Sequence, residues 1–179
     1  MNIVRGGGPE TPLNETGRVQ ARKLAAELTD KNLEIIYSSP LARCTETARI
    51  IAGGMGLGVL THDGLKERDS GSLAGRVVKS DKNYTPPDGE SLDNVARRMT
   101  AAILEIAETT EFSTIGVCTH SAPMVMILER LTGQMPDFQN ISNGYIFKVI
   151  WNDGKLSLPR SHVCEIPFAG EGVPPEAAG

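Results

Sequence analysis

The fold can be predicted by working outward from residues 33–43, which read Leu33-Glu34-Ile35-Ile36-Tyr37-Ser38-Ser39-Pro40-Leu41-Ala42-Arg43. The run Leu33–Tyr37 is short and largely apolar, as is typical of a buried β-strand. Ser38-Ser39-Pro40 then turns the chain into a helix, which we expect to end at Gly53-Gly54 because glycine is a common helix stop. A strand followed by a helix is the repeating unit of a parallel α/β sheet.

The same order of strand, turn and helix is found on both sides of this stretch. Met1–Val4 is a short apolar strand, and a glycine-rich loop leads from it to an amphipathic helix over Glu15–Leu28. Asn14 or Thr16 is the predicted N-cap of that helix. Val59–Thr61 is a further short strand.

Toward the C-terminus, Thr114–Thr119 is another buried strand and ends at His120. Ser121 is the predicted N-cap of the helix that follows, and Gly133 closes that helix. An earlier helix begins after Ser91. Its apolar side chains at helical spacing are Val95, Met99, Ile103 and Ile106.

Two segments depart from this alternation. Residues 63–90 lack sustained periodicity and contain several glycines and prolines, so we expect a long connection with a functional role. Tyr145–Trp151 and Lys155–Leu158 are expected to pair as a hairpin across Asn152-Asp153-Gly154.

Strands alternating with helices predict a three-layer α/β/α sandwich with a mostly parallel sheet. We place one domain over residues 1–165 and a Pro/Gly/Ala-rich C-terminal tail over residues 166–179. The 18 Lys+Arg against 22 Asp+Glu give a net charge of −4, which argues against a general binder of nucleic acids or anionic membranes. Three cysteines without a Cys-x-x-Cys pair, and no secretory signal, predict a cytoplasmic protein without a structural metal.

Polar side chains follow three of the predicted strands: Arg5, Ser38-Ser39 and His120. Because the carboxyl ends of parallel strands meet at one edge of the sheet, these residues face one crevice, which Arg43 can reach from its helix. Two arginines, a histidine and helix N-termini would form a phosphate or carboxylate pocket, with Glu90 as the nearest candidate proton donor. Taken singly, Arg43, Glu90 and His120 are more often ordinary polar residues, so it is their joint arrangement that favours a site.

Several short motifs occur in order along nearly the whole chain. They are Val4-Arg5-Gly6-Gly7, Leu13-Asn14-Glu15-Thr16-Gly17-Arg18-Val19-Gln20-Ala21, Tyr37-Ser38-Ser39-Pro40-Leu41-Ala42-Arg43-Cys44 with Thr47-Ala48, Leu65-Lys66-Glu67 with Gly71 and Gly75, Gly89-Glu90-Ser91, and Val117-Cys118-Thr119-His120. With these motifs the chain resembles the histidine phosphatase superfamily, which includes cofactor-dependent phosphoglycerate mutases and small-molecule phosphatases. The resemblance implies a phosphoglycerate mutase-like fold.

The resemblance also implies a mechanism. In that family a histidine after the first strand attacks phosphorus and carries a phosphohistidine. Arg5, Arg43 and His120 match the residues that hold the phosphoryl oxygens, and Glu90 matches the glutamate that protonates the leaving oxygen and later activates water. This chemistry implies no metal and no cofactor.

The chain departs from the family pattern at the nucleophile. Arg5-Gly6-Gly7 stands where the family has Arg-His-Gly, so the nucleophile position is Gly6, which has no side chain. His62, in a weak strand, and His162, near the C-terminus, are not convincing substitutes.

Three interpretations follow. The favoured one is a divergent protein that acts on a small phosphorylated or otherwise anionic metabolite without phosphohistidine, with Glu90 and His120 in acid–base roles. The second is a noncatalytic phosphate-binding protein, a pseudophosphatase, whose affinity comes from Arg5, Arg43 and His120. In the third, Gly6 replaces the histidine of an otherwise active small-molecule phosphatase.

Overall fold

The computed structural model of the chain describes residues 11–74, 85–136 and 143–159. Within these ranges the centre is a parallel sheet of β1 (Ile35–Ser38), β2 (Gly58–Thr61) and β3 (Ile115–Cys118), in the order β2-β1-β3. Tyr37 lies opposite Leu60 on one side and opposite Val117 on the other. The strands therefore run in the same direction and end at the same edge of the sheet.

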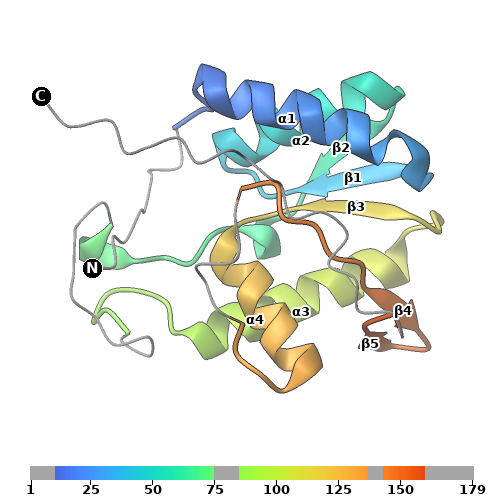
Figure 1. Cartoon of the computed structure of the whole chain (residues 1–179). Coiled ribbons are helices and arrows are strands. Elements are labelled where there is room, and N and C mark those ends of the chain that lie inside the picture. Colours follow the sequence, from blue (N-terminus) through green and yellow to red (C-terminus); the bar gives the residue numbers. More distant parts are fainter. Residues whose placement is uncertain (1–10, 75–84, 137–142, 160–179) are drawn as a thin grey trace, which may run out of the picture.

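Helices cover both faces of this sheet, as Figure 1 shows. The helices α1 (Glu15–Leu28) and α2 (Ala42–Met55) lie on one face, and α3 (Leu92–Thr109) and α4 (Ser121–Thr132) lie on the other. The described ranges also contain the short 3-10 helices η1 (Thr29–Lys31), η2 (Asp63–Leu65) and η3 (Gly71–Leu73). The predicted three-layer α/β/α arrangement is therefore confirmed.

Apolar side chains form a buried cluster on each face of the sheet. The cluster toward α1 and α2 contains Leu24, Ile36, Ala48, Ile51 and Ala52. The cluster toward α3 and α4 contains Leu65, Met99, Ala102, Ile106 and Ile127. Within α3 the buried residues Val95, Met99, Ala102 and Ile106 recur every three or four residues, with Ala96 beside them, as expected for a helix that buries one stripe.

The helix ends with local sequence signals lie where they were predicted. The helix α1 has the predicted bounds, and Asn14 caps it by accepting a hydrogen bond from the Gly17 N–H at 2.8 Å. Ser91 caps α3 by accepting from the Asn94 N–H at 3.1 Å. Gly133 ends α4 in the left-handed conformation, with φ of 71°.

Two predicted helix ends were wrong. The helix α2 does not end at Gly53-Gly54 but continues to Met55, and the left-handed residue that stops it is Gly56, with φ of 69°. A glycine stops a helix only where the chain turns left-handed, since elsewhere it adopts ordinary helical angles. The N-cap of α4 is His120, and Ser121 is the first helical residue.

The predicted hairpin is present but shorter than expected. It consists of β4 (Ile150–Asn152) and β5 (Lys155–Ser157), which pair in antiparallel fashion, and residues 145–149 are not part of a strand. Asp153 and Gly154 have positive φ values of 47° and 75°, as a tight two-residue turn requires. Figure 1 shows the hairpin beside the C-terminal half of α3, away from the carboxyl ends of the parallel strands.

Some predicted segments lie outside the described residues. These are the strand Met1–Val4, the following Arg5 and Gly6, and the tail over residues 166–179. The long connection predicted over residues 63–90 contains η2 and η3, and its residues 75–84 also lie outside the described ranges. Among the described helices, none is both long and apolar enough to cross a membrane.

Candidate active site

The carboxyl ends of β1 and β3 lie side by side and are followed by Ser39 and His120. The Ser39 N–H donates to the Cys118 carbonyl oxygen at 2.9 Å, which extends the pairing of the two strands past Ser38. Ser38 and Ser39 have no exposed surface. The ends of β1 and β3 therefore form the buried floor of a site at this edge of the sheet, as the chain topology predicted.

His120 is buried at this edge, with 8 % of its surface exposed, and its Nε2 lies 2.8 Å from Ser39 Oγ. Burial, together with the positive charges of Arg43 and Arg98, lowers the pKa of His120 from 6.5 to about 3. His120 is therefore neutral at pH 7. It can act as a hydrogen-bonding group at this edge rather than as an additional cation.

We expect the free energy of unfolding to decrease as the pH is lowered, because of His120. In the unfolded chain its pKa is 6.5 and in the folded protein it is about 3, so between these values only the unfolded state binds the proton. The stability is complete above the unfolded pKa and is lost as the pH falls toward the folded pKa, at up to about 1.4 kcal/mol per pH unit. Urea denaturation at several pH values between about 7 and about 4 measures this slope.

The control for this measurement is His120→Asn, which removes the titrating ring and keeps a polar side chain. Its stability is expected to depend less steeply on pH than that of the wild type, because one buried titrating group is gone. Equal slopes in the two proteins would contradict the assignment of the pH dependence to His120.

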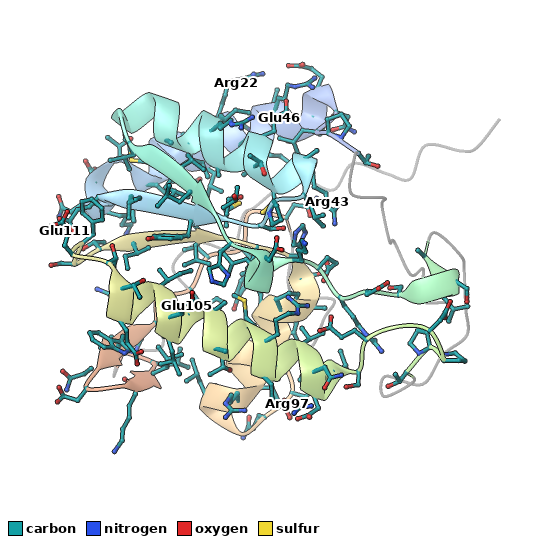
Figure 2. All side chains as sticks on the ribbon, turned by 180° about the vertical axis from the view of Figure 1, so that it is seen from behind. Arg22, Arg43, Glu46, Arg97, Glu105 and Glu111 are labelled. Carbon is teal, nitrogen blue, oxygen red and sulfur yellow. The ribbon has the colours of Figure 1, made fainter. Side chains whose placement is uncertain are left out.

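Arg43 reaches the same edge from the start of α2, where it is the second helical residue (Figure 2). Its positive charge opposes protonation of His120 and favours the ionised forms of Cys44 and Glu67. The guanidinium group is therefore within electrostatic reach of α2, of the end of β3 and of the segment after η2. The structure thus brings Arg43 and His120 to one edge.

Two thiols lie behind this edge and join α2 to β3. The Sγ atoms of Cys44 and Cys118 are 3.2 Å apart. This contact lowers the pKa of Cys44 and raises the pKa of Cys118. Because Cys44 follows Arg43 and Cys118 lies two residues before His120, the thiol contact helps to set the spacing of these two side chains.

Glu67 is a further side chain at this edge, and it belongs to the motif Leu65-Lys66-Glu67 but was not among the predicted site residues. Its Oε1 accepts a hydrogen bond from the Arg68 N–H at 2.9 Å, and its Oε2 lies 3.5 Å from Ser121 Oγ at the start of α4. Burial raises the pKa of Glu67 above 4.5, although the N–H groups of Arg68 and Ala122 and the charge of Arg43 act in the opposite direction. A carboxyl group that is protonated more readily than usual is suited to donate a proton.

Glu90, the predicted proton donor, has both carboxylate oxygens paired with Arg98. Arg98 Nε donates to Oε1 at 2.9 Å and Arg98 Nη2 donates to Oε2 at 2.7 Å, as a bidentate ion pair. A carboxylate bound in this way has its oxygens occupied by donors. The carboxyl group that lies next to Arg43 and α4 is that of Glu67.

Of the predicted site residues, Arg43, Glu90 and His120 are described, whereas Arg5 and Gly6 lie outside the described residues. The signal that could have found Glu67 is its place in the motif Leu65-Lys66-Glu67, two residues beyond the fully buried Leu65. That signal is weak, because the same connection also contains other carboxylates.

Comparison with known proteins gives the chain a family. The family model of the histidine phosphatase superfamily (branch 1) matches residues 2–162. Phosphoserine phosphatase 1 of Hydrogenobacter thermophilus is 34% identical over 127 residues, which cover 63% of this chain and 60% of that enzyme. The match therefore spans less than two thirds of that relative. Other curated relatives have the names of phosphatases or phosphoglycerate mutases.

Solved structures with the same fold confirm the predicted phosphoglycerate mutase-like architecture. Bacillus stearothermophilus YhfR aligns with a TM-score of 0.75 over 87% of both chains, at 21% identity. A phosphoserine phosphatase mutant from Entamoeba histolytica, with a histidine changed to alanine and in complex with phosphoserine, aligns with a TM-score of 0.69 at 26% identity. That alignment covers 87% of this chain and 86% of the other.

Proposed function

The chain belongs to the histidine phosphatase superfamily, and from this premise we propose that it hydrolyses a small phosphorylated metabolite without a phosphohistidine intermediate. Its relatives are phosphatases or mutases that act on small phosphorylated metabolites. The observation that carries the proposal is the grouping of Arg43, neutral His120 and Glu67 where β1 and β3 end. This edge offers a cation, a neutral hydrogen-bonding ring and a carboxyl group that is readily protonated.

Each of the three side chains has a distinct role in the proposed reaction. The Arg43 guanidinium binds phosphoryl oxygens, and neutral His120 contributes a hydrogen bond to them. Glu67 gives its proton to the leaving oxygen as the phosphorus–oxygen bond breaks. Water supplies the new oxygen on phosphorus, and the proton that water releases returns to Glu67. The products are an alcohol and inorganic phosphate.

Gly6 is the reason for proposing hydrolysis by water. It stands where the family has its nucleophilic histidine, and glycine has no side chain that could attack phosphorus. The Entamoeba histolytica structure supports substrate binding in such a site, because that phosphatase holds phosphoserine with a histidine changed to alanine. We propose Arg5, which precedes Gly6, as a second cation for the phosphoryl group.

A noncatalytic phosphate-binding protein is the second candidate function, and Gly6 also favours it. Binding without turnover requires only the cation and the hydrogen-bond donors. The two candidates are separated by assaying a panel of phosphomonoesters, including phosphoserine, together with binding of orthovanadate. Turnover supports the hydrolase, vanadate binding without turnover supports the binding protein, and the absence of both contradicts the two candidates together.

Arg43→Met is expected to weaken orthovanadate binding by about 10- to 100-fold, because hydrogen bonds to charged groups contribute about 1.5–3 kcal/mol. Isothermal titration calorimetry measures the affinity. The matched control is Arg49→Met, since Arg49 lies on the same helix and is exposed. The control is expected to bind as the wild type does, and an Arg43→Met variant with unchanged affinity would exclude Arg43 from the anion site.

A further inference from the structure

Two thiols meet where α2 lies against the end of β3, directly behind the candidate active site. Cys44 is the third residue of α2, and Cys118 is the last residue of β3. Cys118 packs against the apolar cluster toward α1 and α2, so its side chain lies on the face of the sheet that α2 covers. The two Sγ atoms are 3.2 Å apart. Because the sulfur atoms of a disulfide are about 2.05 Å apart, bond formation requires them to approach by only roughly 1 Å.

The backbone on both sides of the thiols is held at the same close approach. Cys44 Sγ lies 3.7 Å from the carbonyl oxygen of Thr119, and Cys118 Sγ lies 3.5 Å from the carbonyl oxygen of Cys44. The end of β1 binds both elements, since the Ser39 N–H donates to the Cys118 carbonyl at 2.9 Å and Thr45 Oγ1 donates to the Ser39 carbonyl at 3.0 Å. The fold therefore keeps the two sulfur atoms paired.

Cys44 is the thiol of this pair that is suited to react first with an oxidant. The Cys118 thiol lowers the pKa of Cys44. The Ser38 hydroxyl, the Ser39 backbone and the charge of Arg43 act in the same direction, while burial opposes them. The thiolate is the form that attacks an oxidant. Cys44 is only 4 % exposed and Cys118 is partly exposed, which favours a small oxidant such as hydrogen peroxide over a bulky disulfide reagent.

We propose that Cys44 and Cys118 are a redox-modification site: hydrogen peroxide converts the two thiols to a disulfide that joins α2 to β3 and weakens anion binding at Arg43 and His120. The Cys44 thiolate attacks one peroxide oxygen, the O–O bond breaks, and the leaving hydroxide takes up the proton that the thiol released. Cys118 then attacks the sulfur of the resulting sulfenic acid, the S–O bond breaks, and the leaving hydroxide takes up the Cys118 proton. Two thiols are thereby oxidised, and one peroxide is reduced to two waters.

The effect on anion binding follows from the places of the two cysteines in the chain. Arg43 immediately precedes Cys44, and His120 lies two residues after Cys118. Drawing the sulfur atoms together shifts the first turn of α2 relative to the end of β3, and so shifts Arg43 relative to His120. Because a misplacement of about 1 Å can cost as much as about 100-fold, we expect inorganic phosphate to bind about 10-fold more weakly to the oxidised protein. Only this effect rests on the proposed function, and the disulfide chemistry does not.

The test uses the full chain with Cys164→Ser, which removes the cysteine that lies outside the described residues and leaves the pair. The protein is treated with hydrogen peroxide, the excess is removed, and peptides are mapped without reduction. We expect a linked Cys44–Cys118 peptide that dithiothreitol separates. The melting temperature is expected to rise by roughly 5–15 °C, because the disulfide joins residues 74 positions apart.

The matched control is Cys118→Ser in the same background, which keeps Cys44 and has no partner thiol. It is expected to give no linked peptide and no rise in melting temperature. Two free thiols after peroxide treatment, or sulfinic acid at either cysteine without a linked peptide, overturn the proposal. If Cys118→Ser does not fold, the peptide map of the Cys164→Ser protein decides by itself, since the linked peptide is either present or absent.

Isothermal titration calorimetry with inorganic phosphate compares the reduced and the oxidised protein. Phosphate is the probe because orthovanadate can itself oxidise thiols. Weaker binding to the oxidised protein, restored by dithiothreitol, supports the proposal. Equal affinity of the two forms overturns the effect of the disulfide on the anion site. Absence of phosphate binding in the reduced protein contradicts the proposed function, and the linked peptide still decides whether the disulfide forms.

Discussion

Gly6→His is expected to raise phosphatase turnover by about 10³-fold or more. A histidine at this position would attack phosphorus and divide the hydrolysis into the formation and the breakdown of a phosphohistidine. In other enzymes, loss of the covalent nucleophile leaves a residual of only ~10³–10⁴ over water out of a much larger acceleration. Restoring the nucleophile in a chain that keeps Arg43 and His120 should therefore recover a large part of that difference.

The measurement is kcat/KM for phosphoserine, together with the mass of the protein after rapid acid-free quenching. A covalent intermediate adds one phosphoryl group to Gly6→His and none to the wild type. The matched control is Gly7→His, which places the same side chain one residue away. If Gly6→His binds orthovanadate but gains no turnover, the site has been rebuilt and Gly6 does not stand at a nucleophile position.

Glu67→Gln is expected to lower kcat/KM for an alkyl phosphate such as phosphoserine by about 10²–10⁴-fold, the usual contribution of a general acid. An alkoxide is a poor leaving group and needs the proton. A nitrophenolate leaves without one, so turnover of p-nitrophenyl phosphate should fall much less. Steady-state assays measure how much turnover of each substrate falls in Glu67→Gln. A loss of folding would lower turnover of both substrates equally.

The pH dependence of kcat/KM provides a second test of Glu67 as the proton donor. Because Glu67 must be protonated to act and its pKa is raised by burial, kcat/KM is expected to fall as the pH rises through its folded-state pKa, above 4.5. This decline should be absent in Glu67→Gln.

Two other carboxyl groups provide controls for this profile. Glu105→Gln should keep the decline, since Glu105 is exposed and pairs with His62 at 3.3 Å. Glu90→Gln is also expected to keep it. If instead Glu90→Gln removes the decline and Glu67→Gln keeps it, Glu90 is the proton donor that the family resemblance implied.

The parts of the fold that were predictable depend on interactions between near neighbours. Asn14 and Ser91 each cap a helix by accepting a hydrogen bond from a residue three positions later. The sequence pattern that predicts each cap therefore spans only a few consecutive residues. The end of α2 was not predictable in this way. Gly53, Gly54 and Gly56 are all capable of ending a helix, and only the structure shows that Gly56 is the one that turns left-handed.

By itself the sequence determined the family, the alternation of strands and helices, and the edge at which Arg43 and His120 meet. It could do so because parallel strands that end in polar residues must present them on one side. It also predicted that Gly6 stands at the family's nucleophile position.

Only the tertiary structure decided how the two candidate carboxyl groups are held. Glu67 and Glu90 are both acidic residues in the same long connection, and each lies in a short motif, Leu65-Lys66-Glu67 or Gly89-Glu90-Ser91. The difference arises because Arg98, from α3, pairs with both oxygens of Glu90 and holds the segment that leads to Glu67. Burial raises the pKa of Glu67. These contacts join residues about 30 positions apart, so they exist only once the helices have packed on the sheet.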